Sequence, residues 1–152
     1  MKIRFTVLLC FVFVIVAVGG ATAQFATPEH AIKYRKAVMF LIAQHFGRMG
    51  AMVKETSAYY KETFVDNAIL VETLSRLTWQ AVFVPGSDKG DTTLNASAFQ
   101  QQTKFNELAL TFETQAAKLV SSAQSGDLKA IKTQFGEVAK SCKACHTEFR
   151  SR

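Results

Sequence analysis

Hydrophobic side chains recur at alternating intervals of three and four residues along most of the chain after residue 26. This spacing gathers apolar groups on one face of an α-helix. The strict two-residue alternation of a half-buried strand is absent from the sequence. We therefore expect an all-α protein built from four amphipathic helices.

The first predicted helix begins after Thr27, a residue suited to capping, with Pro28 at its first position and Glu29 in its first turn. Gly47 and Gly50 weaken its C-terminal part, and the stretch 57–63 either links to the next helix or begins it. The side chains predicted to face inward are Ile32, Arg35, Met39, Ile42, Phe46 and Met49.

A second helix is predicted to end before Val84, Pro85 and Gly86, with Trp79 flanking its inner face. Residues 87–95 are polar, contain glycine and lack a period, so they predict one long loop at an end of the molecule. The predicted inward positions of this helix are Leu70, Leu74, Leu77 and Ala81.

The third helix should begin near Ala96 and end at Gly126, which suits a C-terminal cap, and Asp127 can cap the fourth. Four such helices with mostly short connections predict an antiparallel up-down four-helix bundle. The third inner face is Phe105, Leu108, Phe112, Gln115 and Leu119. The fourth is Leu128, Ile131, Phe135, Val138, Cys142, Cys145 and Phe149.

Residues 1–23 have the layout of a secretory signal peptide: basic Lys2 and Arg4, an uncharged run over 5–18, and a small-residue cleavage site at 21–23. A membrane anchor is the alternative, but the run is shorter than the roughly 20 residues that span a bilayer. We expect cleavage before Gln24, export to the periplasm and one mature domain over 24–152.

The net charge of the chain and its distribution limit the classes of binding partner that we expect. The whole chain carries a formal charge of +6. Loss of Lys2 and Arg4 leaves sixteen basic against twelve acidic residues in the mature domain, a charge of +4. Basic and acidic residues alternate along the chain instead of forming the basic stripe that nucleic-acid binding requires. A weak preference for acidic partners is all that this charge predicts.

Cys10 lies in the leader, so the mature chain keeps only Cys142 and Cys145, followed directly by His146. C-x-x-C-H is the attachment sequence of c-type haem. Its two thiols add across the porphyrin vinyl groups, and the histidine can reach the iron. On a helix Cys142 and His146 share a face, and Cys145 lies on the apolar seam, so the haem is predicted in the bundle core.

Two other uses of the cysteine pair stay open from the residues alone. A zinc site needs four ligands, and the remaining histidines, His30 and His45, lie far away in the first helix. A redox-active C-x-x-C pair usually occupies a helix start in a βαβ unit, whereas this pair lies near a C-terminus without predicted strands.

The mature chain resembles the cytochrome c′ family, the class II c-type cytochromes, over nearly its whole length. The attachment sequence lies near the C-terminus in this family, unlike in the small cytochromes c. The matching segments are Gln24-Phe25-Ala26, Pro28-Glu29, Lys33-Tyr34-Arg35, His45-Phe46-Gly47-Arg48-Met49, Trp79, Pro85-Gly86, Gly126-Asp127-Leu128 and Ser141-Cys142-Lys143-Ala144-Cys145-His146.

The resemblance implies one haem c per chain, bound through Cys142 and Cys145, with His146 as the axial iron ligand. It implies that Arg35 contacts a haem propionate, with Lys36 beside it. An arginine on an apolar seam needs such an anionic partner, although its stem could instead carry it to the surface. Arg150 matches a basic residue on the proximal side, or is an exposed terminal arginine.

Met39, one turn after Arg35, is implied to lie over the distal haem face. With Met39 unligated the iron is five-coordinate and high-spin, and the site binds small gases, nitric oxide first and carbon monoxide more weakly. With Met39 as sixth ligand the protein is a low-spin electron carrier. The resemblance also implies a homodimer, and we expect a periplasmic redox partner. No catalytic constellation is visible, since His30 and His45 have no serine or cysteine nucleophile beside them, so we expect a protein that is not an enzyme. A haem-free interaction bundle is a third hypothesis.

Overall fold

The computed structural model describes residues 24–151, which fold into helices connected by loops, and the all-α prediction is confirmed. Extended pairing in this range is limited to one isolated antiparallel bridge between Leu94 and Arg150. The helices are α1 (Pro28–Val53), α2 (Lys61–Ser75), η1 (Thr78–Ala81), α3 (Ser97–Gln100), α4 (Gln102–Ser125) and α5 (Leu128–Phe149). The predicted signal peptide at 1–23 lies outside the described residues.

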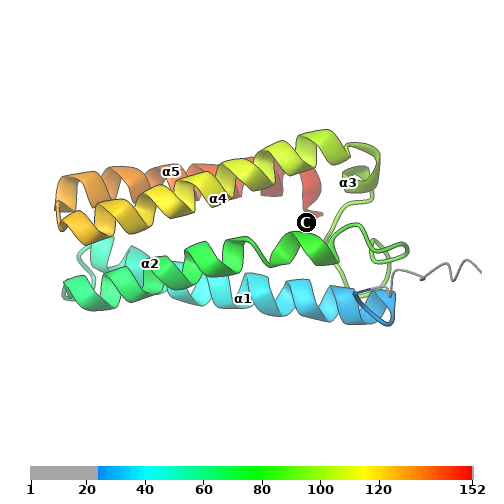
Figure 1. Cartoon of the computed structure of the whole chain (residues 1–152), viewed down its shortest axis with the longest axis horizontal. Helices are drawn as coiled ribbons and strands as arrows, with labels where there is room; N and C mark the ends of the chain where they lie inside the picture. The colour runs from blue at the N-terminus through cyan, green and yellow to red at the C-terminus, as the bar shows by residue number, and fades with distance from the viewer. Residues whose placement is uncertain (1–23, 152) are drawn as a thin grey trace, which may run out of the picture.

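The four long helices form the predicted antiparallel up-down bundle (Figure 1). Each packs against its sequence neighbour, and α1 returns to meet α5, which closes the ring. The N-terminal end of α1, η1, the long loop, α3 and the C-terminal end of α5 all lie at the same end of the bundle (Figure 1). We call it the loop end.

The predicted helix boundaries at three caps are confirmed. The Thr27 hydroxyl accepts a hydrogen bond from the His30 amide at 3.3 Å, at the start of α1. Gly126 ends α4 with a φ of 76°, a left-handed conformation that glycine adopts without steric cost. Asp127 then accepts from the first amides of α5.

The predicted inner face of the second helix is wrong in part, although Leu74 packs against the core and Ala81 is fully buried. Leu70 and Leu77 are exposed, at 43% and 36%, and α2 ends at Ser75 instead of running to residue 81. Residues that pack inward from this helix are Phe64, Asn67, Ala68, Val71 and Ser75. Both sets follow the three-and-four spacing, so periodicity could not distinguish them. The prediction chose the set that is richer in leucine.

The other predicted inner faces need smaller corrections. On α1, Val38 is fully packed while Met39 and Phe46 are half-buried. On α5, Leu128 is 48% exposed because it lies in the first turn, at the very end of the bundle. The predicted third helix is interrupted at Gln101, whose φ of −118° and ψ of 45° separate α3 from α4.

Two apolar clusters form the core. The larger runs along all four long helices and includes Val38, Phe64, Leu119 and Val138. The smaller, around Phe105 and Phe149, lies nearer the loop end. Trp79 packs against both clusters and so joins them.

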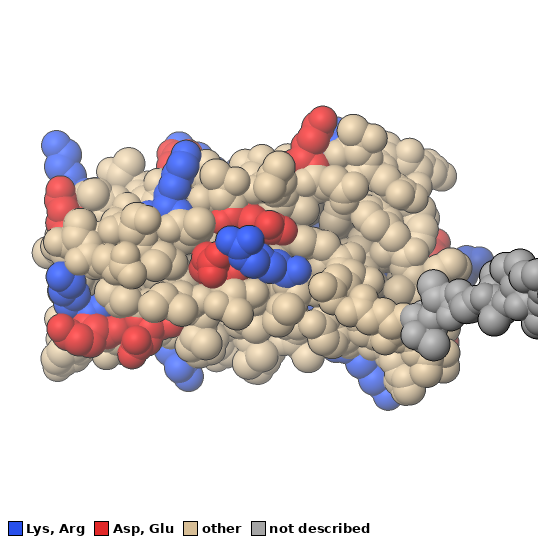
Figure 2. Space-filling model, in the orientation of Figure 1, with Lys and Arg blue, Asp and Glu red and all other residues tan. Residues whose placement is uncertain are grey.

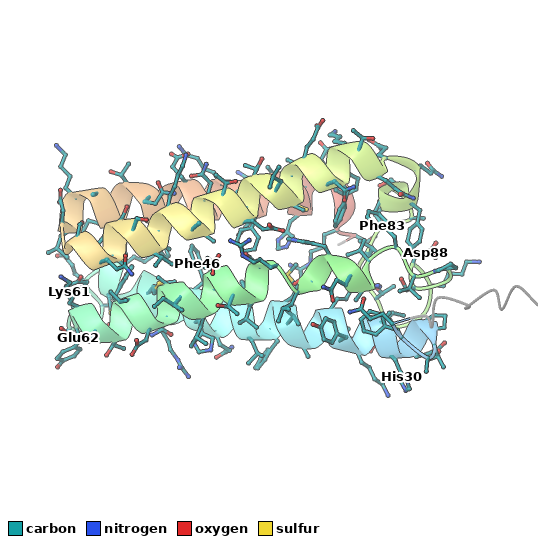
Figure 3. The ribbon with its side chains drawn as sticks, in the orientation of Figure 1. His30, Phe46, Lys61, Glu62, Phe83 and Asp88 are labelled. Carbon is teal, nitrogen blue, oxygen red and sulfur yellow. The ribbon has the colours of Figure 1, made fainter. Side chains whose placement is uncertain are left out.

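Far from the loop end, α1 and α5 approach closely. The rings of Phe46 and Phe135 stack with their centroids 4.1 Å apart and their planes within 4°. A Cβ added to Gly50 would lie 3.3 Å from the Phe135 ring, so glycine permits this approach. Figure 3 labels Phe46 between Lys61 and Glu62 at one end and Phe83 and Asp88 at the loop end, nearer the former.

On the face that Figure 2 displays, acidic and basic side chains are interspersed, without a continuous patch of either sign. The exposed fraction of several apolar side chains on the bundle surface is large, with Phe40 at 62% and Leu110 at 63%. Within residues 24–151, none of the helices is both long enough and apolar enough to cross a membrane.

Candidate functional site

The C-x-x-C-H sequence occupies the last turns of α5, at the loop end of the bundle. Cys142 and Cys145 are both half-buried and neither is in a disulfide. Cys142 packs against the larger apolar cluster and Cys145 against the smaller one. The two thiols therefore face the bundle interior where the two clusters meet, as the sequence predicted.

The surroundings of the thiols suppress their ionisation. Burial raises the pKa of Cys142, and burial together with the neighbouring Cys142 raises the pKa of Cys145 to about 11. Catalytic and redox-active cysteines have lowered pKa values instead. The thiol–disulfide alternative is therefore disfavoured by the electrostatics of this helix end.

His146 follows Cys145 on α5 and is solvent-exposed. Partial desolvation of the ring and the positive charge of Arg150 lower the pKa of His146. This favours the neutral imidazole, the form that can ligate a metal. Within residues 24–151, His, Cys, Asp and Glu side chains do not gather in threes, so the pair lacks the further ligands of a zinc site.

Arg35 is 6% exposed and donates through both of its terminal nitrogens to the loop end. Nη1 donates to the Ala81 carbonyl at 3.1 Å and to the Ser87 hydroxyl at 3.0 Å. Nη2 donates to the Ser87 carbonyl and, at 2.6 Å, to the Thr92 hydroxyl. Burial lowers the pKa of Arg35 and the nearby Asp88 carboxylate opposes that effect.

The four acceptors of the Arg35 guanidinium are neutral oxygens of η1 and the long loop. Arginine carries five N–H donors, and the four terminal ones match these four bonds, which leaves the Nε–H for a further acceptor. The alternative in which Arg35 reaches the surface is wrong, because the side chain is buried.

The neighbouring Lys36 points to a different partner. Its ammonium forms a 2.6 Å ion pair with Asp91, in which both side chains are solvent-exposed.

Met39 is half-buried and packs against the larger cluster, the same cluster that Cys142 contacts. Arg150 is exposed, and its backbone amide donates to the His146 carbonyl at 3.2 Å.

The residues present fit a covalently attached haem. Two protonated thiols three residues apart face an apolar interior, with a neutral imidazole adjacent, and this donor set suits thioether formation and iron ligation. Among adjacent long helices, α1 and α5 contact each other least. Their closest described aromatic contact, the stack of Phe46 on Phe135, lies away from the cysteines.

Sequence reasoning missed several polar residues at this end. Ser87 is fully buried, and its hydroxyl both accepts from Arg35 and donates to the Val82 carbonyl. Thr92 accepts from Arg35 as described above. Their hydroxyls lie in a polar loop without a period, and the sequence carries no signal that would distinguish them from solvent-exposed residues.

Comparison with known proteins identifies the family in which this arrangement occurs. The family model described as "Cytochrome C'" matches residues 30–150. The cytochrome c′ of Alcaligenes xylosoxydans xylosoxydans is 38% identical over 129 residues, covering 85% of this chain and 99% of the relative. That of Rubrivivax gelatinosus is 36% identical over 130 residues, covering 85% of this chain and the whole relative.

Solved structures agree. Cytochrome c prime from Shewanella frigidimarina superimposes with a TM-score of 0.82 at 38% identity, covering 85% of this chain and all of that one. A nitric oxide complex of a mutant of cytochrome c prime from Alcaligenes xylosoxidans gives a TM-score of 0.78 at 37% identity, with 85% and 99% coverage. Because the family model spans residues 30–150 and relatives at 36–38% identity cover 85% of the sequence, the chain belongs to the cytochrome c′ family and carries covalently bound haem c.

Proposed function

We propose that Cys142 and Cys145 hold the haem through thioether bonds and that His146 is its axial iron ligand. The observation that carries this assignment is the position of the two thiols, which face the apolar interior from the last turns of α5. When bound, the haem supplies an iron centre that binds diatomic gases and changes its oxidation state.

Arg35 and Lys36 are proposed to mark the propionate side. Arg35 is a buried cation near the N-terminal end of α1 with its Nε–H still available, and a carboxylate is the strongest acceptor for such a donor. Lys36 lies beside it and already pairs with Asp91. Arg150 is proposed to lie on the proximal side, because its charge already acts on the pKa of His146.

The distal pocket is proposed to form around Met39 and its apolar neighbours Val38 and Ile42. These side chains offer an entering ligand no hydrogen-bond donor, so water and anions are disfavoured there and small uncharged molecules are admitted. We therefore propose a five-coordinate site that binds nitric oxide, and carbon monoxide more weakly. The nitric oxide complex of the relative with 37% identity supports this assignment.

A second candidate is a low-spin electron carrier with Met39 as sixth ligand. Its support is that Met39 packs into the same cluster as Cys142, although methionine is also a common filler of irregular cores. Absorption spectra of the ferric and ferrous protein distinguish the two. We expect high-spin spectra that Met39→Leu leaves unchanged, and a methionine–iron charge-transfer band that this substitution abolishes would establish the second candidate instead.

We further propose that the protein works in the periplasm by binding gases and passing electrons, without catalysing a substrate reaction. Export rests on the signal-like segment 1–23. Within the described chain the His45 ring is hydrogen-bonded to Asn67 at 2.8 Å and has no serine or cysteine nucleophile assigned beside it. Mass spectrometry of the mature N-terminus tests the export step, and Gln24 is the residue expected there.

A homodimer is proposed through α1 and α2. The hydrogen bond between His45 and Asn67 sets the register of these two helices and brings one turn of each to the same level. Exposed apolar side chains lie close to that level on both helices. They are Phe40 and Leu41 of α1 and Ile69 and Leu70 of α2. Sedimentation should give a dimer, and Phe40→Glu with Leu70→Glu should give a monomer that keeps its haem. Equal masses for both would contradict this interface.

The direct test of the haem site is a pyridine haemochrome assay on protein made in a host that matures c-type cytochromes. We expect one haem c per chain. Replacing both Cys142 and Cys145 by alanine should abolish covalent haem and lower the yield, because an unfilled core volume is destabilising. Unchanged folding and yield in that variant would favour the haem-free interaction bundle.

A further inference from the structure

Residues 92–95 of the long loop join two parts of the bundle that are far apart in sequence. One side of this short segment is bound to Arg35 of α1, and the other side is paired with the residues that follow α5. The two helices involved carry Met39 and His146, the residues proposed for opposite faces of the haem. The segment therefore links the two sides of the candidate site without passing through it.

The attachment to α1 depends on a buried cation. Both terminal nitrogens of Arg35 donate to loop oxygens, with the Ala81 carbonyl of η1 as a further acceptor, and the bond to the Thr92 hydroxyl, at 2.6 Å, is the one nearest the C-terminal pairing. Bonds from a buried guanidinium are stronger than neutral ones, and removing one acceptor leaves a charged donor unsatisfied. The loop is thus anchored firmly at this point.

The attachment to α5 is made by the backbone. The Asn95 amide donates to the Phe149 carbonyl at 2.8 Å, and the Ser151 amide donates to the Thr93 carbonyl at 2.8 Å. These two bonds form the antiparallel bridge between Leu94 and Arg150. Phe149, the last residue of α5, is three residues beyond His146. The bridge therefore holds the chain directly after the helix end, at Arg150.

Thr92 connects the two attachments. Its hydroxyl oxygen accepts from Arg35 Nη2 and also from the Leu94 amide at 3.0 Å, so one atom holds both the cation and the start of the bridge. The path from α1 to the end of α5 thus runs through Arg35, Thr92 and Leu94.

We infer that Thr92 and Arg35 are positioning residues that fix the C-terminal end of α5, and with it His146, relative to α1. The hydrogen-bonded connection is independent of any cofactor, whereas its effect on an iron–histidine bond rests on the proposed function. Coupling of this kind is reciprocal: loosening the end of α5 must also loosen the loop near Thr92.

Thr92→Val is the variant that separates this role from general packing. Valine keeps the shape of threonine and removes the oxygen, whereas Thr92→Ser keeps the oxygen and should rescue. Thr93→Val is the matched control, because Thr93 is exposed and contributes its carbonyl, not its side chain, to the bridge.

Two readouts on the purified haem protein test the inference. Hydrogen exchange should accelerate about tenfold at the amides of both Asn95 and Ser151 in Thr92→Val, the effect of losing roughly one hydrogen bond. Resonance Raman of the ferrous protein should show a shifted or broadened iron–histidine stretch. Thr92→Ser and Thr93→Val should resemble the unaltered protein in both measurements.

The reciprocal arm removes residues 151–152, which deletes the Ser151 donor while leaving Thr92 intact. It should accelerate exchange at Leu94 and tryptic cleavage after Lys89, and it tests the connection even where Thr92→Val does not fold. Fast exchange confined to the loop, with Ser151 and the iron–histidine stretch unchanged in Thr92→Val, would overturn the inference. Absence of covalent haem would instead refute the proposed function, while the exchange measurements would still test the connection.

Discussion

The indole Nε1 of Trp79 donates a hydrogen bond to Glu113 Oε1 at 2.6 Å, and the indole ring meets Phe105 and Phe112 edge-on, with centroids 5.7 and 6.3 Å away. The contact joins η1 to α4 and lies where the two apolar clusters meet. Buried or half-buried tryptophan usually finds a partner for its N–H, and here the partner is a carboxylate.

Glu113→Ala should therefore destabilise the fold by about 1 to 2 kcal/mol, because the half-buried indole N–H loses its acceptor. Glu113→Gln keeps an acceptor and should lose less. Urea unfolding followed by circular dichroism measures both, with Glu107→Ala on the exposed side of α4 as the control. Equal stability of Glu113→Ala and Glu107→Ala would show that the hydrogen bond contributes nothing.

The stack of Phe46 on Phe135 predicts a second effect. Phe135→Ala should lower the free energy of unfolding by about 2 to 3 kcal/mol, since it removes a half-buried ring and leaves a cavity between α1 and α5. Phe135→Leu refills much of the volume and should lose less. Thermal unfolding of the haem protein measures the difference, and no change in melting temperature for Phe135→Ala would contradict the packing described for these helices.

The ion pair between Lys36 and Asp91 predicts a pH dependence. The hydrogen bond from Lys36, and then its charge, lower the pKa of Asp91 in the folded protein. A lowered carboxyl pKa contributes stability that is present above the ordinary aspartate value and is lost as the pH falls through the lowered one. Because both side chains are exposed, the effect on stability is small.

An NMR titration of the Asp91 carboxyl should accordingly give a midpoint below that of an unpaired aspartate. Lys36→Gln should return the midpoint toward the ordinary value, and added salt should act in the same direction. A midpoint that is unaffected by Lys36→Gln would mean that the pair does not persist in solution.

The N-terminal cap of α5 predicts a local effect on the helix that carries the cysteines. Asp127 Oδ1 accepts from the Lys129 amide at 2.8 Å and from the Ala130 amide at 3.2 Å. Asp127→Ala should cost about 1 kcal/mol of stability, whereas Asp127→Asn, which keeps the oxygen, should cost less. Chemical denaturation measures both, and the ferric absorption spectrum should not change in either, since the cap is at the other end of the helix from His146.

Local chemistry made much of the fold predictable. Thr27, Gly126 and Asp127 act through their own backbone geometry or short-range hydrogen bonds, so their roles were visible in the sequence. The C-x-x-C-H segment is likewise contiguous, and a helix fixes which of its residues face inward.

The inner face of α2 could not be predicted from periodicity. The set with Leu70 and Leu77, which are exposed, and the set around Phe64 and Val71, which is buried, follow the same spacing, and only tertiary packing selects between them. The exposed leucines are instead available to an interface between chains. The partners of Arg35 were missed for a related reason, because Ser87 and Thr92 lie more than fifty residues away and neutral hydroxyls and carbonyls carry no charge pattern.

Covalent attachment of haem at Cys142 and Cys145 underlies every other role proposed for this site, and mass spectrometry of the purified mature protein tests it most directly. We expect an intact mass raised by one haem, and a proteolytic peptide spanning 142–146 that carries the added tetrapyrrole. Free thiols at both cysteines, in protein produced by a host competent to mature c-type cytochromes, would contradict it.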